Sequence, residues 1–157
     1  MKQLYSSIEI DAPVERVWAT LTDFAAYPTW NPFLPRITGA PQVGARLEVR
    51  LEPPGGMGAT LHPTVLEAEP NGAFRWLGRL FVPGVFDGEH HFVLESQGDD
   101  RTRLIQQERF TGLLVPLFAR SLDEHTLAGF HAMNAALKAR AEASTSATAS
   151  GRTPAAA

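Results

Sequence analysis

A short segment rich in proline and aromatic residues, residues 27–33, constrains the fold more than any other part of this sequence. It reads Tyr-Pro-Thr-Trp-Asn-Pro-Phe. Proline fixes the backbone torsion φ and lacks an amide hydrogen, so two prolines in this run exclude a helix interior and a central strand. The aromatic side chains make the segment too apolar for a solvated loop. We therefore expect a rigid plug in which Trp30 and Phe33 pack at one end of the hydrophobic core.

The composition fits one domain of ordinary size. The chain has 157 residues, of which 44% are hydrophobic, and a formal net charge of −3. That charge gives no electrostatic sign of a nucleic-acid partner or an anionic membrane. The absence of cysteine excludes disulfides and thiolate metal sites. The sequence starts without a secretory signal and has no apolar run long enough to span a membrane, so we predict a cytoplasmic protein without membrane insertion.

The composition changes near the end of the chain. We predict one domain over residues 1–142 and a tail over residues 143–157, which is rich in Ala, Ser and Thr. Such a tail cannot bury enough apolar surface to offset its ordering entropy, so we expect it to be disordered.

The first third of the chain predicts a strand followed by two short helices. Residues 3–10 alternate with period two, as in a strand. Residues 11–13, Asp-Ala-Pro, are typical of a helix start, and residues 14–21 carry apolar side chains at helical spacing. A second short helix is expected over residues 23–26, ending before Pro28.

The middle of the chain predicts an antiparallel meander. Turn residues separate segments with strand patterns, after a short strand expected over residues 35–38. Pro63 indicates an edge position or a bulge in the second of these segments. The expected strands are 46–52, 59–68, 73–81, 85–95 and 102–111.

The last element is a long helix over about residues 116–142, with an apolar stripe at steps of three and four residues. A long helix after a meander must bury that stripe on the sheet. The predicted class is α+β. In it a curved antiparallel sheet of six to seven strands wraps around the C-terminal helix, and two short helices follow strand 1. The stripe consists of Phe118, Leu122, Thr126, Phe130, Met133 and Leu137.

Several sequence motifs in the chain resemble those of a known protein family. They lie at residues 12–18, 21–23, 27–33, 75–78, 86–92 and 108–114. Over about residues 3–142 the chain resembles the SRPBCC, or polyketide cyclase/dehydrase-like, family of the START-like superfamily, and this resemblance implies the helix-grip fold. The resemblance implies a deep hydrophobic cavity between sheet and long helix, used for lipids, hormones, polyketides or other small apolar molecules. One fold hosts many activities, so it does not fix the function.

Strand alternation predicts which side chains face that cavity. Trp76 lies on the face opposite Arg75 and Arg79, so the Trp76 face is the better inner one. Phe92 and Phe110 are the apolar anchors of the next two strands. The predicted cavity residues are Trp30, Phe33, Trp76, Leu80, His90, Phe92, Gln106, Glu108, Phe110, Phe130 and Met133.

Two ionisable residues, His90 and Glu108, share this inward register and are expected to face each other on neighbouring strands. Three interpretations stay open. The pair can fix strand register, contact a polar group of a ligand, or act as acid and base. His90 and Glu108 are therefore the candidate catalytic residues if the protein is an enzyme.

The favoured function is binding or carrying a small hydrophobic molecule, because few polar residues face inward. The first alternative is an aromatase/cyclase-like enzyme that uses His90 and Glu108, in which much of the catalysis is positioning. The second is a partner-binding module. No cofactor and no metal site are predicted, since the histidines are dispersed. We expect a small hydrophobic ligand, no nucleic acid, and a monomer or homodimer; the sequence does not identify the ligand.

Overall fold

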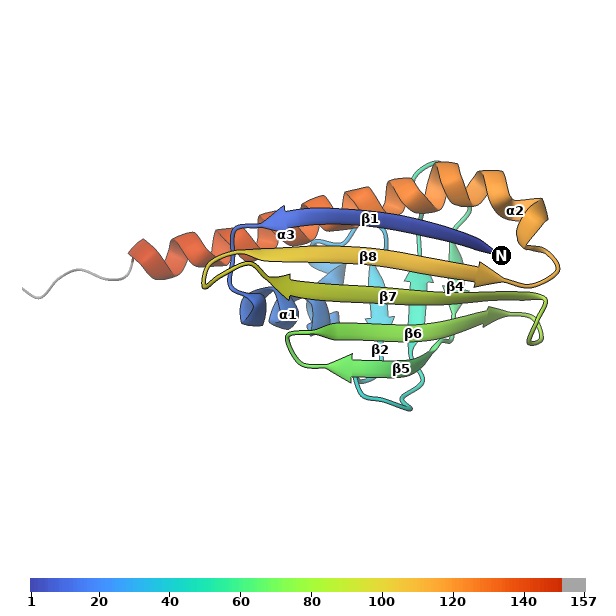
Figure 1. Cartoon of the computed structure of the whole chain (residues 1–157), viewed down its shortest axis with the longest axis horizontal. Coiled ribbons are helices and arrows are strands. Elements are labelled where there is room, and N and C mark those ends of the chain that lie inside the picture. Colours follow the sequence, from blue (N-terminus) through green and yellow to red (C-terminus); the bar gives the residue numbers. More distant parts are fainter. Residues whose placement is uncertain (151–157) are drawn as a thin grey trace, which may run out of the picture.

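The protein has an α+β fold, described by a computed structural model for the backbone of residues 1–150 and the side chains of residues 1–143. In chain order the elements are β1 (Lys2–Ile10), α1 (Val14–Thr22), η1 (Phe24–Thr29), β2 (Arg36–Thr38), β3 (Glu48–Leu51), β4 (Ala59–Leu61), β5 (Thr64–Glu69), β6 (Ala73–Leu80), β7 (Phe86–Ser96), β8 (Thr102–Thr111), α2 (Val115–Ser121), η2 (Leu122–Thr126) and α3 (Leu127–Ser150). The helix η1 is a 3₁₀ helix and η2 is a π-helix. Figure 1 shows α1, α3 and the short strands on one side of a large sheet.

The strands form two antiparallel sheets, a five-stranded one in the order β1-β8-β7-β6-β5 and a three-stranded one in the order β2-β3-β4. The predicted α+β class is confirmed. The prediction of a single sheet of six to seven strands is wrong, because the strands are divided between two sheets. The segment 59–68 divides into β4 and β5 at Pro63, because proline cannot donate to a strand ladder. Three backbone hydrogen bonds join the segment before β3 to the segment around Pro63 and β5. They run from Leu47 N–H to Pro63 O (2.8 Å), from Val65 N–H to Ala45 O (2.9 Å) and from Gly44 N–H to Val65 O (2.9 Å).

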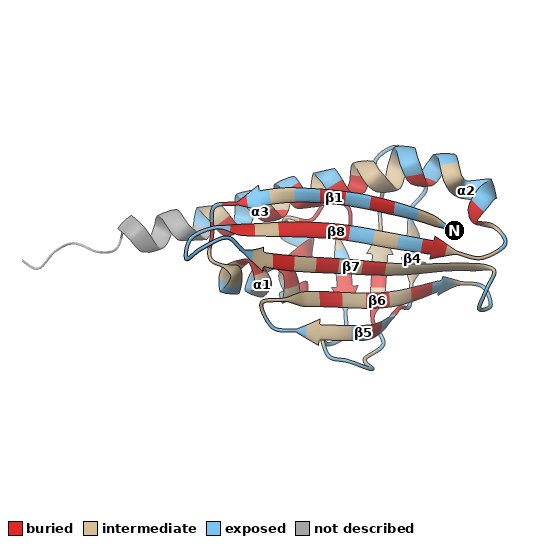
Figure 2. Ribbon diagram, viewed as in Figure 1, coloured by how far each residue is buried: buried red, intermediate tan, exposed pale blue. Residues whose placement is uncertain are grey.

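The core lies between the inner face of the five-stranded sheet and α3. Buried and less buried residues alternate along β1 and β6, as Figure 2 shows. Each β-strand therefore contributes every second side chain to this face. The helix contributes Phe130, Met133 and Leu137, all fully buried. These three residues confirm the second half of the predicted helix stripe.

The first half of that stripe is interrupted by η2. The Leu127 N–H bonds to Leu122 O, five residues back, where an α-helix bonds four back. This wider turn changes the rotational register of α2 relative to α3. Phe118, expected in the stripe, is 39% exposed as a result, whereas Leu122 is buried.

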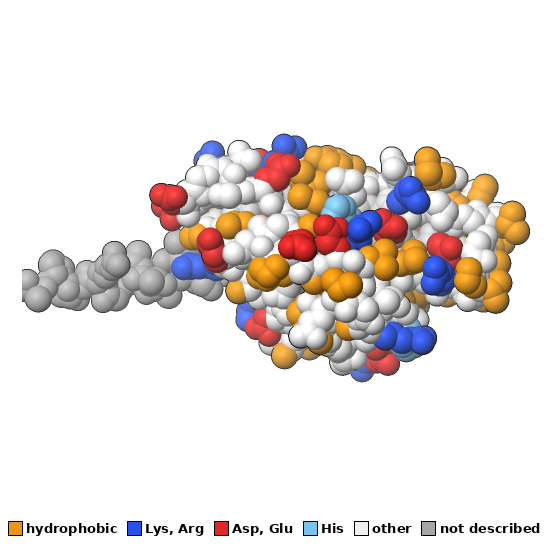
Figure 3. All heavy atoms as spheres, turned by 60° about the horizontal axis from the view of Figure 1, so that its bottom comes forward, with side chains coloured by type: hydrophobic (Ala, Val, Ile, Leu, Met, Phe, Trp, Pro, Cys, Tyr) orange, Lys and Arg blue, Asp and Glu red, His pale blue; other side chains and the backbone are white. Residues whose placement is uncertain are grey.

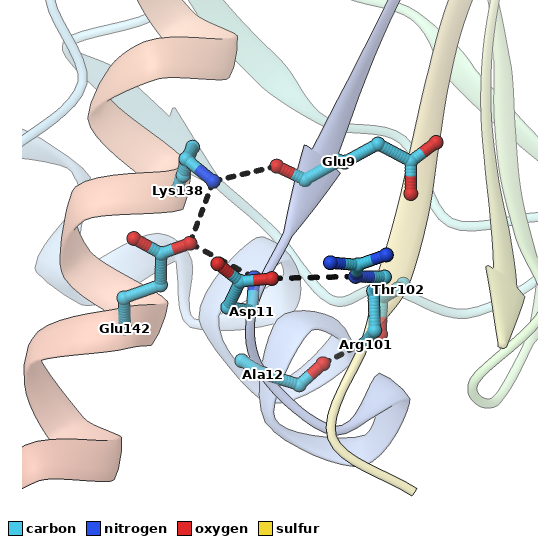
Figure 4. Close-up of polar contacts among 7 residues, drawn as sticks. All are labelled: Glu9, Asp11, Ala12, Arg101, Thr102, Lys138 and Glu142. Carbon is cyan, nitrogen blue, oxygen red and sulfur yellow. Dashed lines mark hydrogen bonds and ion pairs between the residues drawn. The ribbon is translucent and has the colours of Figure 1, made fainter. Parts of the chain in front are cut away.

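Polar contacts attach α3 to the turn between β1 and α1 (Figure 4). Lys138 Nζ donates to the Glu9 carbonyl (2.7 Å) and pairs with Glu142 (2.7 Å). The Asp11 N–H donates to Glu142 Oε1 (2.8 Å). The hydrogen bonds from Lys138 and from the Asp11 amide lower the pKa of Glu142. On the other side of the turn, Thr102 Oγ1 donates to the carbonyl of Ala12 (2.8 Å).

The segment 27–33 packs at one end of the core. Pro28 lies inside η1, so the second short helix runs past the predicted end at Ala26. The side chain of Asn31 orders the following turn, because its Oδ1 accepts the N–H groups of Phe33 (3.0 Å) and Leu34 (2.9 Å). Phe33 is buried and packs edge-on against Phe130, with 5.8 Å between ring centroids.

The predicted boundary near residue 142 stays a prediction. The helix α3 continues to Ser150, and residues 151–157 of the predicted tail lie outside the described residues.

Candidate ligand-binding site

The candidate site is built on one row of directly opposed residues in the large sheet. His90 on β7 lies opposite Trp76 on β6 and opposite Glu108 on β8. The next row places Phe92 opposite Gln106. Because these residues alternate in phase with the apolar anchors of their strands, all five face α3.

His90 and Glu108 are in contact, as their register predicted. Nδ1 of His90 lies 3.3 Å from Oε2 of Glu108, and the two side chains are 4% and 13% exposed. An ionised carboxylate only accepts hydrogen bonds, so this contact is attractive when the proton of the imidazole is on Nδ1. We assign that tautomer to His90 on these grounds.

Gln106 extends the contact on the other side of the imidazole. Its Nε2 lies 3.0 Å from His90 Nε2 and 3.6 Å from the Met133 sulfur. With the proton on Nδ1, His90 Nε2 accepts from the Gln106 amide. Gln106 is completely buried, and its Oε1 has no hydrogen-bond partner among the described residues. We call Gln106, His90 and Glu108 the polar triad.

Aromatic rings surround the imidazole of the triad. Ring centroids lie 4.4 Å away for Phe92, 5.1 Å for Phe130 and 5.2 Å for Trp76. These rings exclude water from His90 and contact one another, with 5.4 Å between Trp76 and Phe92. The enclosed cavity expected from the sequence stays a prediction.

Two facing glycines lie near the triad, and one of them leaves room for the carboxylate. Gly78 and Gly88 lie opposite each other on the inner face, in the row next to Trp76 and His90. A Cβ at Gly88 would lie 2.9 Å from Glu108 Oε1, so the missing side chain accommodates the carboxylate. A Cβ at Gly78 would meet nothing closer than 3.8 Å.

A second buried polar group lies where β1 meets α3. Asn134 Nδ2 donates to Ser6 Oγ (3.0 Å), and Ser6 Oγ also lies 3.1 Å from His131 Nδ1. Ser6 pairs with Gln106 across β1 and β8. The Asn134 side-chain oxygen is buried and has no partner in the part of the chain described. The sequence prediction missed Asn134, although its position next to Met133 in the helix stripe was an available signal.

The structure brings together most of the predicted cavity residues, but not all of them. Phe33 reaches the triad through Phe130, whereas Trp30 packs on Tyr27, with 4.8 Å between ring centroids. Leu80 is half-buried at the far end of β6. The roles of all these residues as ligand contacts stay predictions.

The outer face of the large sheet carries charges, as the outward register of Arg75 predicted. The guanidinium of Arg75 pairs with Glu67 (3.0 Å) and Glu89 (3.1 Å). Figure 3 shows acidic and basic side chains together across this face. Burial lowers the pKa of His91, against the opposing effect of Glu67. A hollow of about 210 Å³ lies beside these residues. Its lining is mostly polar, unlike the interior.

Comparison with known proteins shows the family. Over residues 1–142 the chain matches the family described as polyketide cyclase/dehydrase and lipid transport, and it belongs to that family. No curated protein sequence matches the chain significantly. Within the described residues no helix is long and apolar enough to cross a membrane.

Solved structures show the same fold at low sequence identity. The Zhui aromatase/cyclase from Streptomyces sp. R1128 is 18% identical, with a TM-score of 0.74 over 92% of this chain and 95% of that one. A START superfamily protein from Mycobacterium smegmatis is 22% identical, with a TM-score of 0.69 over 90% and 97% of the two chains. The di-domain ARO/CYC protein BexL, from the BE-7585A biosynthetic pathway, is 16% identical, with a TM-score of 0.70. This chain spans about half of BexL, since the match covers 92% of this chain and 48% of that one.

Proposed function

We propose that the protein binds a small, largely apolar molecule between the five-stranded sheet and α3. The polar triad contacts the ligand's polar group. The observation that carries this proposal is the buried oxygen of Gln106, which has no partner among the described residues although it is joined through His90 to a carboxylate. An unpaired polar group in a protein interior costs about 1–3 kcal/mol, which a ligand donor would recover.

Energetic considerations favour a role of the polar triad in ligand binding over a role in stabilising the fold. Buried ionic groups stabilise a fold poorly, because their desolvation offsets their mutual attraction. Apolar side chains of similar volume would fill the space between Trp76 and Phe130 at least as well. A role in recognition accounts for polar residues at this place.

We propose that the ligand enters at one end of the molecule. Glu108 is the partly exposed member of the triad, and Phe110 next to it packs on Phe86, which in turn packs on Phe118. Both ring pairs have centroid distances of 5.6 Å. Beyond them lies a set of exposed apolar side chains, visible at the right of Figure 3. This apolar end consists of Phe81, Val82, Leu113 and Leu117, which are 62–83% exposed.

An enzymatic role is the second candidate, and the contact between His90 and Glu108 favours it. A carboxylate next to an imidazole is a common acid–base arrangement, and the Zhui protein, which has the same fold, is an aromatase/cyclase. Binding ranks first because both nitrogens of His90 already have partners within the triad. A reaction would require Gln106 to move before Nε2 could take a proton from a substrate.

Binding can be tested with a neutral fluorescent probe, N-phenyl-1-naphthylamine, and by native mass spectrometry of the gently purified protein. We expect saturable probe binding, or a co-purified small molecule.

Gly78→Val should weaken binding at least several-fold, because the new side chain enters the space next to Gly88. Arg79→Val is the matched control, since Arg79 is the next residue on β6 and faces outward. Absence of both probe binding and a co-purified molecule would contradict the proposal.

A further inference from the structure

We infer that the ligand of this site carries a hydrogen-bond donor, such as a phenol, an alcohol or an amine, and not a carboxylate. This inference rests on the proposed binding function and narrows its ligand class. It follows from which atoms of the interior lack partners, taken with the fixed direction of the hydrogen bonds in the triad.

The direction within the triad starts at the carboxylate. Glu108 Oε2 is 3.3 Å from His90 Nδ1, which must carry the proton for the contact to be attractive. His90 Nε2 is then an acceptor and takes a hydrogen from Gln106 Nε2 at 3.0 Å. The Gln106 amide is therefore oriented with its NH₂ group toward His90 and its oxygen away from it. Reversing the amide would require a proton on His90 Nε2, and therefore either an imidazolium or a protonated Glu108 in this buried position.

Around the triad and its contact with α3, the polar atoms left over among the described residues are oxygens that accept, whereas the unpaired donors Trp30 Nε1 and Asn31 Nδ2 lie in the proline-rich segment 27–33. They are Gln106 Oε1 and Asn134 Oδ1, both buried without a partner among the described side chains, and the second oxygen of Glu108, which is next to Gly88. Gln106 and Glu108 lie two positions apart on β8, so their side chains point to the same face. Asn134 contacts Ser6, the residue opposite Gln106.

This set of acceptors discriminates between polar groups of a ligand. A hydroxyl or amine can donate to them, and a hydrogen bond to a charged acceptor is among the stronger ones in proteins. A carboxylate would bring a negative charge next to Glu108 and add acceptors where donors are missing. An ether cannot donate a hydrogen bond and carries no charge. Its affinity should therefore fall between that of the hydroxyl compound and that of the carboxylate.

Three probes with the same apolar body separate these cases: 2-naphthol, 2-methoxynaphthalene and 2-naphthoate, titrated calorimetrically into the purified protein at neutral pH. We expect 2-naphthol to bind roughly 10-fold more tightly than the ether, the ratio that one charge-assisted hydrogen bond implies. 2-Naphthoate should bind more weakly than the ether. The order of affinities in the unmodified protein tests the inference without any variant.

Two substitutions place the effect at the triad. Glu108→Gln removes the charge and should narrow the ratio of 2-naphthol to 2-naphthoate affinity at least several-fold. Glu89→Gln makes the same chemical change one residue from His90 on the outer face, so it should leave the ratio unchanged. If Glu108→Gln fails to fold, Gln106→Met removes the unpaired oxygen and should reduce the preference for 2-naphthol over the ether.

The outcomes distinguish the two proposals. 2-Naphthoate binding as tightly as 2-naphthol, or all three probes binding equally, would overturn the donor inference and leave the binding function standing. Binding of none of the three, together with no binding of N-phenyl-1-naphthylamine, would overturn both. A preference for 2-naphthol that Glu89→Gln abolishes and Glu108→Gln preserves would also overturn the inference, because it would place the selectivity on the outer face.

Discussion

The ring of Phe33 occupies the position that a side chain at Gly129 would need. A Cβ added to Gly129 would overlap this ring, and even its Cγ would be 2.8 Å away. The glycine thus allows the proline-rich segment to lie against α3, where Phe33 meets Phe130. The plug predicted from residues 27–33 depends on a helix residue about a hundred positions later in the chain.

Gly129→Ala should destabilise the protein although alanine favours helices. The helix preference of alanine over glycine is worth about 1 kcal/mol, whereas forcing a methyl group into a packed contact costs typically about 1–3 kcal/mol. Here the contact is with an aromatic ring held by Asn31, so we expect a net loss. The free energy of unfolding in urea, followed by circular dichroism, measures it.

A double-mutant cycle identifies the cause. Phe33→Leu is smaller and more adaptable at the contact, so Gly129→Ala should cost less in that background than in the unmodified protein. Equal costs in both backgrounds would show that the ring does not limit the residue at position 129.

Tyr27 should make the protein sensitive to alkaline pH. Burial, and to a smaller extent the Asp23 carboxylate, raises the pKa of Tyr27 far above its usual value of 10.0. In the unfolded chain this phenol ionises above pH 10, while in the folded chain it stays protonated and donates to the Leu21 carbonyl. Its contribution is therefore complete below pH 10 and decreases as pH rises above that value, by about 1.4 kcal/mol per pH unit.

Urea unfolding between pH 8 and pH 11 checks this expectation. Tyr27→Phe should reduce stability at pH 8 by about 1–3 kcal/mol, because the buried Leu21 carbonyl loses its donor, and should flatten the alkaline decline. Tyr5→Phe, at an exposed position of β1, keeps Tyr27 and should keep the steep decline. An unchanged slope in Tyr27→Phe would refute the assignment.

Trp30 provides a separate test of the plug. Trp30→Ala should cost about 3–5 kcal/mol, the usual range for deleting a packed aromatic ring. Trp30→Phe should cost much less, because it retains a ring against Tyr27 and removes an indole N–H that is buried without a partner among the described residues. Thermal unfolding of the two variants compares them. A loss below about 1 kcal/mol in Trp30→Ala would place the ring outside the core.

The sequence predicted the elements whose pattern is local. β8 was predicted with its observed bounds, and β6 and β7 within one residue at each end, because alternation and flanking turn residues both mark a strand. The split at Pro63 and the π-helical turn at Leu122 were missed. Both depend on tertiary packing. At Pro63 the chain passes from one sheet to the other, and at Leu122 the helix changes its register so that α3 can pack across the large sheet.

The candidate site shows the same division. Register alone placed His90 and Glu108 on one face and opposite each other, since the period of a strand fixes both. Periodicity could not give the orientation of the Gln106 amide or the contact of Asn134 with Ser6, because side-chain rotamers and helix docking decide them. The room that Gly88 leaves for the carboxylate was not predicted for the same reason.

The final prediction separates the stability of the triad from its use. Replacing all three members with apolar residues, His90→Phe, Gln106→Met and Glu108→Leu together, should leave the protein as stable as before or more stable by about 1–4 kcal/mol, as for other buried ionic groups. Phe92 and Phe130 already surround position 90 with rings, so phenylalanine fits that environment. The same variant should lose the preference for 2-naphthol over 2-methoxynaphthalene.

The single variant Glu108→Leu should behave in the opposite way. It leaves the Nδ1 donor of His90 buried without its acceptor, which costs about 1–3 kcal/mol, so the single change should be less stable than the triple one. Urea unfolding of both variants gives the order. If the triple variant is the less stable of the two, the polar triad stabilises the fold, and the interpretation of His90 and Glu108 as a structural pair gains over their role in binding.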